Sequence, residues 1–97
     1  MILYHAVREE DYLPGIMRRG LIPRESYEPG LWSGRKLFLS DTPSNVTPWG
    51  PIILEVSIPS DVKVHSTRGE VGDPEEYWVS KRIPPEYIRV YSVDKDW

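Results

Sequence analysis

The chain contains no cysteine and only two histidines. The absence of cysteine excludes disulfides, thiol catalysis and thiolate metal sites. The histidines, His5 and His65, lie far apart in the sequence, so we expect no metal site. No apolar run approaches the roughly 20 residues that span a bilayer, and the amino-terminal segment lacks a basic region followed by a long apolar stretch. These absences favour a cytoplasmic protein without a membrane partner.

The chain has no excess of positive charge. It carries 12 basic and 15 acidic side chains, a formal net charge of −3. The densest basic cluster, Arg18, Arg19 and Arg24, is diluted by Glu25 and Glu28. Strong electrostatic binding of the whole domain to a phosphate backbone is therefore not expected, although a local patch still allows contact with nucleic acid.

Length and composition fit a single domain over residues 1–97. Hydrophobic residues make up 39% and charged residues 28%, which is ordinary for a globular protein. Ten prolines and four tryptophans indicate a loop-rich fold with rigid turns and large aromatic anchors.

The apolar pattern predicts short strands separated by turns and loops. Asp11 is expected to cap a helix of about two turns that Gly20 ends. A shorter helical turn is expected within residues 42–50, and long loops over residues 21–34 and 66–74. Strands are predicted over residues 2–7, 36–40, 52–58, 62–64, 77–80 and 87–93.

Two of these segments carry additional expectations. Residues 52–58 alternate apolar with other side chains, which predicts a strand with one buried face. Pro84 and Pro85 predict a rigid, extended connector with Ile83 and Ile88 buried. The whole pattern predicts an α+β domain with a small, curved, mainly antiparallel β core and one or two short helices.

Three short segments, in the same order as in a known family, carry a resemblance to it. LYHAV is similar to the first-strand motif of the poly(ADP-ribose) polymerases, GRKLFLSD resembles their Gly-Lys-Gly-Ile-Tyr-Phe-Ala-Asp, and EEYWV resembles their Asn-Glu-Tyr-Ile-Val. The helix ending at Gly20 and Leu21 also resembles that of DNA-targeting ADP-ribosyltransferase toxins and RNA 2′-phosphotransferases, which share the fold. The resemblance implies an ADP-ribosyltransferase-like domain that uses NAD as co-substrate.

The resemblance also implies roles for single residues. Breaking the bond between nicotinamide and ribose makes an oxocarbenium-like sugar, which a carboxylate can stabilise. The resemblance assigns that role to Glu76 and implies that His5 is a second catalytic residue. His5 is also the residue implied to hold the adenosine ribose, and the Ala6 backbone to hold the nicotinamide amide. Without the resemblance, Glu76 is a solvated loop residue and His5 a strand histidine bonded to a backbone carbonyl.

Aromatic and hydroxyl side chains complete the implied NAD site. Phe38 falls where the family has a tyrosine, so it keeps a stacking face but has no hydroxyl. Trp49 takes the place of a second stacking aromatic, or else is a core or lid anchor. Ser40 is a candidate hydrogen-bonding partner of the nicotinamide amide, or else caps the turn that follows it.

Basic side chains are candidates for the pyrophosphate. Arg35 or Lys36 is placed to neutralise it, and Arg18 or Arg19 is a candidate from the helix, although surface arginines are commonly only solvated. His65 is expected in an exposed loop, with contact to a phosphate or an acceptor as the alternative.

Three functions remain open at this point. The first is transfer of ADP-ribose from NAD to a macromolecular acceptor, protein or nucleic acid, or hydrolysis of NAD. The second is a non-catalytic module of the same fold that binds NAD, ADP-ribose or a protein. The third is RNA 2′-phosphotransfer, for which the full set of basic residues is not evident.

Overall fold

A computed structural model describes residues 1–25, 35–67 and 76–97. Within these ranges the chain is α+β, as the sequence predicts. The helical elements are η1 (Glu10–Tyr12), α1 (Leu13–Arg19), η2 (Pro43–Asn45), η3 (Thr47–Trp49) and η4 (Pro85–Tyr87), of which only α1 is an α-helix and the others are 3₁₀ turns. The strands are β1 (Ile2–Val7), β2 (Arg24–Glu25), β3 (Arg35–Ser40), β4 (Ile52–Ser57), β5 (His65–Thr67), β6 (Glu76–Val79) and β7 (Ile88–Val93).

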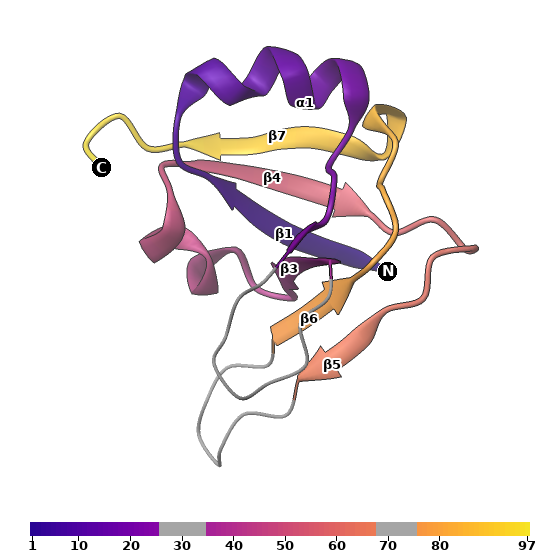
Figure 1. The fold of residues 1–97 in the computed structure, drawn as a ribbon. Helices are drawn as coiled ribbons and strands as arrows, with labels where there is room; N and C mark the ends of the chain where they lie inside the picture. Colours follow the sequence, from indigo (N-terminus) through magenta and orange to yellow (C-terminus); the bar gives the residue numbers. More distant parts are fainter. Residues whose placement is uncertain (26–34, 68–75) are drawn as a thin grey trace.

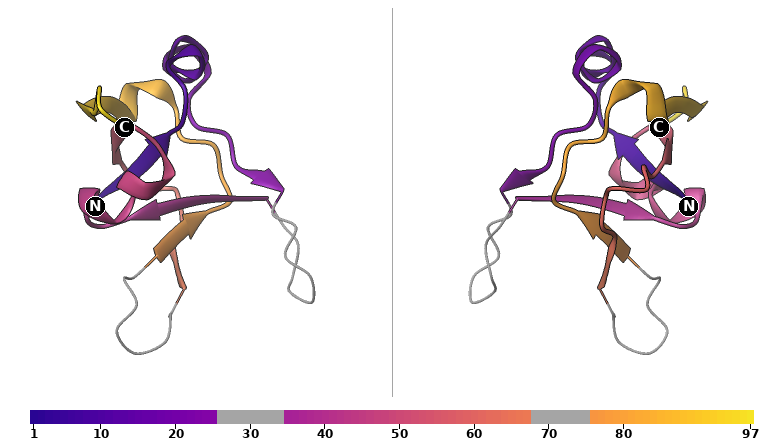
Figure 2. Two further views of the ribbon diagram at one scale, coloured as in Figure 1. Left: turned by 90° about the vertical axis from the view of Figure 1, so that its left-hand side faces the viewer. Right: turned by 90° about the vertical axis from the view of Figure 1, so that its right-hand side faces the viewer.

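The strands form one antiparallel sheet in the order β5-β6-β3-β1-β4-β7, with β2 paired to β3. Every residue of β1 pairs with β4, whereas β1 and β3 share a single register pair, Tyr4 with Ser40. The sheet is therefore strongly twisted at this point. In Figure 1, β1, β4 and β7 run across the view while β3 is seen almost end-on. Figure 2, turned by 90°, shows β3 along its length.

The hydrophobic core lies on one face of this twisted sheet. Both halves of the sheet contribute, because Leu3 and Leu54 face it from one half and Leu39 and Val79 from the other. The helix α1 lies beside β7 in Figure 1, and two of its side chains pack partly against the core. The buried members of the core are Leu3, Val7, Leu21, Leu37, Leu39, Ile52, Leu54, Val56, Val62, Val79, Ile83 and Ile88.

The expectation that β4 has one buried face is wrong. Ile53 and Glu55 point away from the core, yet they are only 3% and 9% exposed. The reason is that β4 lies between β1 and β7, so side chains of both neighbours cover its second face. The Arg89 Nε atom donates to Glu55 Oε1 at 2.7 Å. This bond satisfies the buried carboxylate.

Two expectations about the central and late segments need correction. The strand predicted over residues 62–64 begins later, at His65, because a turn in which the Val62 amide donates to the Pro59 carbonyl directs Val62 into the core. The loop prediction over residues 66–74 is wrong for Ser66 and Thr67, which belong to β5. Residues 68–75 lie outside the described part. In the connector, the predicted burial of Ile83 and Ile88 is confirmed. Pro84 is extended as expected, but Pro85 is not, because it begins the 3₁₀ turn η4.

The segment around α1 also differs from its prediction. Asp11 does not cap the helix but lies inside η1, because the Tyr12 amide already donates to the Glu9 carbonyl. Gly20 ends α1 as predicted, with φ of 86°.

The predicted loop over residues 21–34 is regular at its start. Leu21 exchanges two backbone hydrogen bonds with Ile83, and β2 pairs with β3. Residues 26–34 lie outside the described part. Within that part, no helix is long and apolar enough to cross a bilayer.

Candidate functional site

The single register pair between β1 and β3 creates a junction at which the two strands separate. Just beyond Tyr4, the half-buried His5 ring reaches across the gap, and its Nδ1 lies 2.8 Å from the Phe38 carbonyl oxygen. A carbonyl only accepts, so Nδ1 carries the proton and, in the neutral ring, Nε2 is left as an acceptor. Burial lowers the pKa of His5 and outweighs the opposing effect of this hydrogen bond. His5 is thus a neutral acceptor at the junction near pH 7.

A cavity of about 350 Å³, here called the smaller cavity, opens on one side of the junction. Four separate chain segments line it. Its walls are His5 and Ala6 of β1, Phe38, Leu39 and Ser40 of β3, Asn45, Val46 and Trp49 of the η2–η3 turns, and Glu76 of β6. It brings together all the candidates named for the catalytic, ribose and nicotinamide positions, whereas none of the basic candidates for the pyrophosphate lines it.

Ser40 and Glu76 pair across β3 and β6, and both line the smaller cavity. The Ser40 hydroxyl accepts from Asn45 Nδ2 at 3.2 Å and from the Thr42 amide at 3.4 Å. The capping interpretation of Ser40 is therefore confirmed, and the same hydroxyl oxygen also lines the cavity. Glu76 is exposed at the start of β6, which places its carboxylate within reach of a ligand from solvent.

Two aromatic rings border the smaller cavity. Phe38 is 39% exposed and Trp49 is 67% exposed. Trp49 is therefore not a core anchor, and its ring is open to a ligand. The turn that carries it is tied to the carboxyl-terminal segment, because Trp97 Nε1 donates to the Thr47 carbonyl at 3.0 Å.

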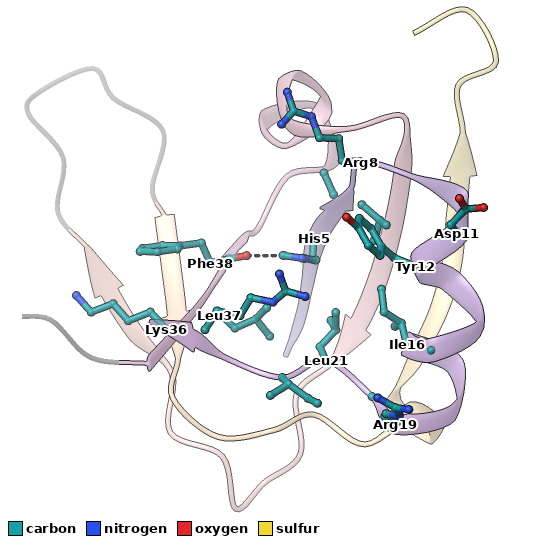
Figure 3. A pocket seen from close by; sticks show the side chains of 16 residues that line it. His5, Arg8, Asp11, Tyr12, Ile16, Arg19, Leu21, Lys36, Leu37 and Phe38 are labelled. Carbon is teal, nitrogen blue, oxygen red and sulfur yellow. Dashed lines mark hydrogen bonds between the residues drawn. The ribbon is translucent and has the colours of Figure 1, made fainter. Parts of the chain in front are cut away.

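A second cavity of about 520 Å³, here called the larger cavity, lies on the other side of the junction (Figure 3). It shares His5, Ala6 and Phe38 with the smaller cavity, so the two cavities adjoin at the junction. The rest of its wall comes from the end of β1, from η1 and α1, and from the segment around β2 and β3. Its charged side chains are Arg8, Asp11, Arg19, Arg24 and Lys36.

Sequence reasoning found only part of the larger cavity. Arg19 and Lys36 were candidates for the pyrophosphate, and both line it, whereas Arg18 and Arg35 do not. Side chains alternate between the faces of a strand, so Arg35 and Lys36 point to opposite faces of β3 and cannot both face the cavity.

Arg8 and Arg24 were missed as members of the site. Arg24 had been counted only as part of a surface cluster, and only the fold brings Arg8 and Arg24 to one cavity. The Lys36 ammonium itself lies 4.7 Å from the centroid of the Trp78 ring, so Lys36 lines the cavity mainly with its stem.

The expectation that His65 lies in a loop is wrong. His65 lies in β5, where it pairs with Trp78. The two rings stack at 4.0 Å with an interplanar angle of 12°. Stacking on a neighbouring strand explains why this polar segment is a strand. His65 belongs to neither cavity, and Arg68, its expected partner, lies outside the described residues.

In the described ranges, no three side chains of histidine, aspartate or glutamate gather in a way that suits a metal ion. Comparisons of the chain with protein-family models, with characterised proteins and with solved structures find no match. The function must therefore be inferred from the residues that line the two cavities.

Proposed function

We propose that the chain breaks the bond between nicotinamide and ribose in NAD and transfers the ADP-ribosyl group to a macromolecular acceptor or to water. The observation that carries this proposal is the composition of the smaller cavity. His5, Ala6, Phe38, Trp49 and Glu76 come from distant segments and line one space. These are the residues that resemble the NAD-binding and catalytic positions of the ADP-ribosyltransferases.

The chemistry of the smaller cavity suits the nicotinamide end of NAD. The nicotinamide ring in NAD is a flat cation, and aromatic faces attract flat cations. Phe38 and Trp49 supply such faces, and Glu76 supplies a negative charge. Among the described lining residues of this cavity there is no lysine or arginine, so no permanent cation repels the ring.

The reaction then follows from the charge that develops. As the bond between the ribose C1′ and the ring nitrogen breaks, its electron pair stays with nicotinamide, which leaves as a neutral molecule. The ribose becomes oxocarbenium-like, and the Glu76 carboxylate stabilises this positive charge. The acceptor forms a new bond to C1′ and releases a proton. His5 accepts a hydrogen bond from a ribose hydroxyl through Nε2, which keeps the sugar at the junction.

The test is nicotinamide release by the wild-type chain and by Glu76→Gln. The variant keeps the size of the side chain but removes its charge, so kcat is expected to fall about 10²-fold or more, as when a preorganised electrostatic group is lost, while the Kd for NAD changes little. Glu86→Gln is the matched control, because Glu86 is an exposed glutamate in η4 outside both cavities. Undiminished release by Glu76→Gln would rule out this role for Glu76.

A non-catalytic module is the second candidate, and Phe38 is the observation that favours it. Its ring offers a stacking face but no hydroxyl, so it contributes to binding without a hydrogen bond to the ligand. Such a module binds NAD or ADP-ribose without consuming it. Titration calorimetry with NAD, run beside the nicotinamide-release assay, separates the two functions.

A further inference from the structure

Ser40 is held so that its proton is the part of the hydroxyl left for a ligand. It lies at the end of β3 and is only 3% exposed, and register pairs with Tyr4 and Glu76 fix its position. A serine hydroxyl has one proton to donate and two lone pairs that accept. Both lone pairs are used, by the Asn45 side chain at 3.2 Å and by the Thr42 amide at 3.4 Å. Ser40 therefore lines the smaller cavity as a hydrogen-bond donor.

Asn45 supplies the opposite kind of group. It is half-buried, and it lines the smaller cavity at the end of η2. Its Nδ2 donates to Ser40, so the side-chain carbonyl Oδ1 is the atom left to accept from a ligand. The turn holds Asn45 in place, because its amide donates to the Thr42 carbonyl at 3.1 Å and the next residue, Val46, is buried. A donor and an acceptor thus lie side by side on two fixed elements.

The group that fits this pair is a primary carboxamide. Its carbonyl accepts and its NH₂ group donates, so both hydrogen bonds form at once. A carboxylate of the same shape only accepts, and its oxygen would meet the lone pairs of Asn45 Oδ1 and the charge of Glu76, which lines the same cavity. A site built to make a hydrogen bond strongly rejects an analogue that cannot make it. The pair therefore selects a carboxamide by attraction and excludes a carboxylate by repulsion.

We propose that Asn45 is a specificity-determining residue, which makes the smaller cavity select a pyridine carboxamide over the corresponding carboxylic acid. It acts directly through Oδ1, and indirectly through Ser40, whose proton it directs toward the ligand. Asn45 lies outside the three family-like segments. The assignment rests on the proposed function for identifying the ligand as NAD, and it adds the exclusion of the nicotinic acid form of the dinucleotide.

The test is titration calorimetry of the full chain with NAD and with its nicotinic acid analogue, in which a carboxylate replaces the amide. Glu76→Gln is the background for every titration, so that NAD is not consumed and the charge of Glu76 does not itself repel the carboxylate. In this background NAD binds about tenfold or more tightly than the acid analogue. Adding Asn45→Leu, which has nearly the same size but no amide, lowers this ratio of affinities about fivefold or more, the factor that one ordinary hydrogen bond gives.

Further variants separate the role of Asn45 from a general effect on the turn. Asn45→Ala introduces no bulk and lowers the ratio by the same factor as Asn45→Leu. Ser44→Ala is the matched control, because Ser44 is an exposed residue of the same turn that lines neither cavity, and the ratio stays within about twofold. When Ser40→Ala is already present, Asn45→Leu changes the ratio less than it does alone, because part of its effect passes through Ser40. Damage to the fold weakens the binding of both ligands and leaves the ratio unchanged.

Three results would overturn the assignment: an unchanged ratio in Asn45→Leu and Asn45→Ala, an equal fall in Ser44→Ala, or tighter binding of the acid analogue than of NAD in the background. Failure of the proposed function looks different. If the ratio behaves as expected and the wild-type chain releases no nicotinamide, the role of Asn45 stands and the enzymatic proposal fails. If nicotinamide is released but the ratio does not respond to Asn45, the assignment fails alone. No binding of NAD at millimolar concentration would overturn both.

Discussion

His5 holds the two halves of the sheet together and offers an acceptor to a ligand. The proton on Nδ1 is committed to the Phe38 carbonyl, and burial keeps the ring neutral. Protonation would convert Nε2 from an acceptor into a donor. Protonation of Nε2 in acid is therefore expected both to destabilise the fold and to remove the hydrogen-bond acceptor from the site.

The first prediction concerns the pH dependence of stability. The folded-state pKa of His5 is lowered below its usual value of about 6.5, so the unfolded chain binds more protons as the pH falls below about 6.5. The contribution of His5 is thus fully present above that pH and is lost as the pH falls toward the lowered pKa. Urea unfolding at pH 7.5 and pH 5.0 measures it.

The His5→Gln variant isolates this contribution, because it keeps a donor for the Phe38 carbonyl but does not titrate. We expect the free energy of unfolding to change less between the two pH values in His5→Gln than in the wild type. His65→Gln serves as the comparison for a histidine outside the junction. An equal change in the wild type and in His5→Gln would show that burial of His5 does not govern this dependence.

At the scale of the element, two glycines near α1 are predicted to respond to alanine with opposite signs. Gly20 has φ of 86°, and a Cβ atom there would collide with the Ile83 carbonyl. Gly15 lies inside α1 with no heavy atom within 4 Å of its Cβ position. Gly20→Ala therefore destabilises the chain by more than about 1 kcal/mol, whereas Gly15→Ala stabilises it by about 0.5–1 kcal/mol.

Thermal unfolding of the two variants is the measurement. For a chain of this size, 1 kcal/mol corresponds to about 4–8 °C, so the two shifts in Tm are large enough to separate. A loss of stability in Gly15→Ala would mean that α1 does not have the helical geometry described.

The turn that carries Trp49 is a second element whose position can be tested. Trp97 donates to the Thr47 carbonyl, and the Trp49 amide donates to Val46 at 3.0 Å within the same pair of turns. Trp97→Phe removes the indole N–H and keeps a ring. Amide hydrogen exchange at Trp49 is expected to be about fivefold faster in this variant, the factor that loss of one ordinary hydrogen bond gives. Lys95→Ala is the control. Equal exchange rates in both variants would show that the hydrogen bond from Trp97 to Thr47 does not hold the turn in place.

The pattern of apolar residues predicted the elements that depend mainly on the local sequence. The strands predicted over residues 2–7 and 36–40 lie within one residue of where the short apolar runs place them, and Gly20 ends α1. The sequence pattern did not predict the strands that form only through a partner far along the chain. His65 becomes part of a strand through its stack on Trp78, and β2 exists through its pairing with β3.

At the scale of the whole molecule, the junction between β1 and β3 decides where a ligand can lie. Most of the smaller cavity was predictable, because the three family-like segments each contribute to it. The larger cavity was predictable only in part, because its arginines lie in separate segments, after β1, on α1 and on β2, that only the fold brings to one space. Opposite charges thus lie on opposite sides of His5, with Glu76 on one side and the arginines on the other.

Binding of NAD at the junction is tested by titrating the ¹⁵N-labelled chain with NAD and following the backbone and indole amide signals in NMR spectra. We expect the largest shifts on both sides of the junction, at His5, Ala6, Phe38 and Trp49 and at Tyr12 and Arg19. Signals of β7 and of the Lys81–Asp61 ion pair, which lie outside both cavities, should stay in place. An absence of shifts at millimolar NAD, or shifts confined to residues outside the two cavities, would contradict binding of NAD at the junction.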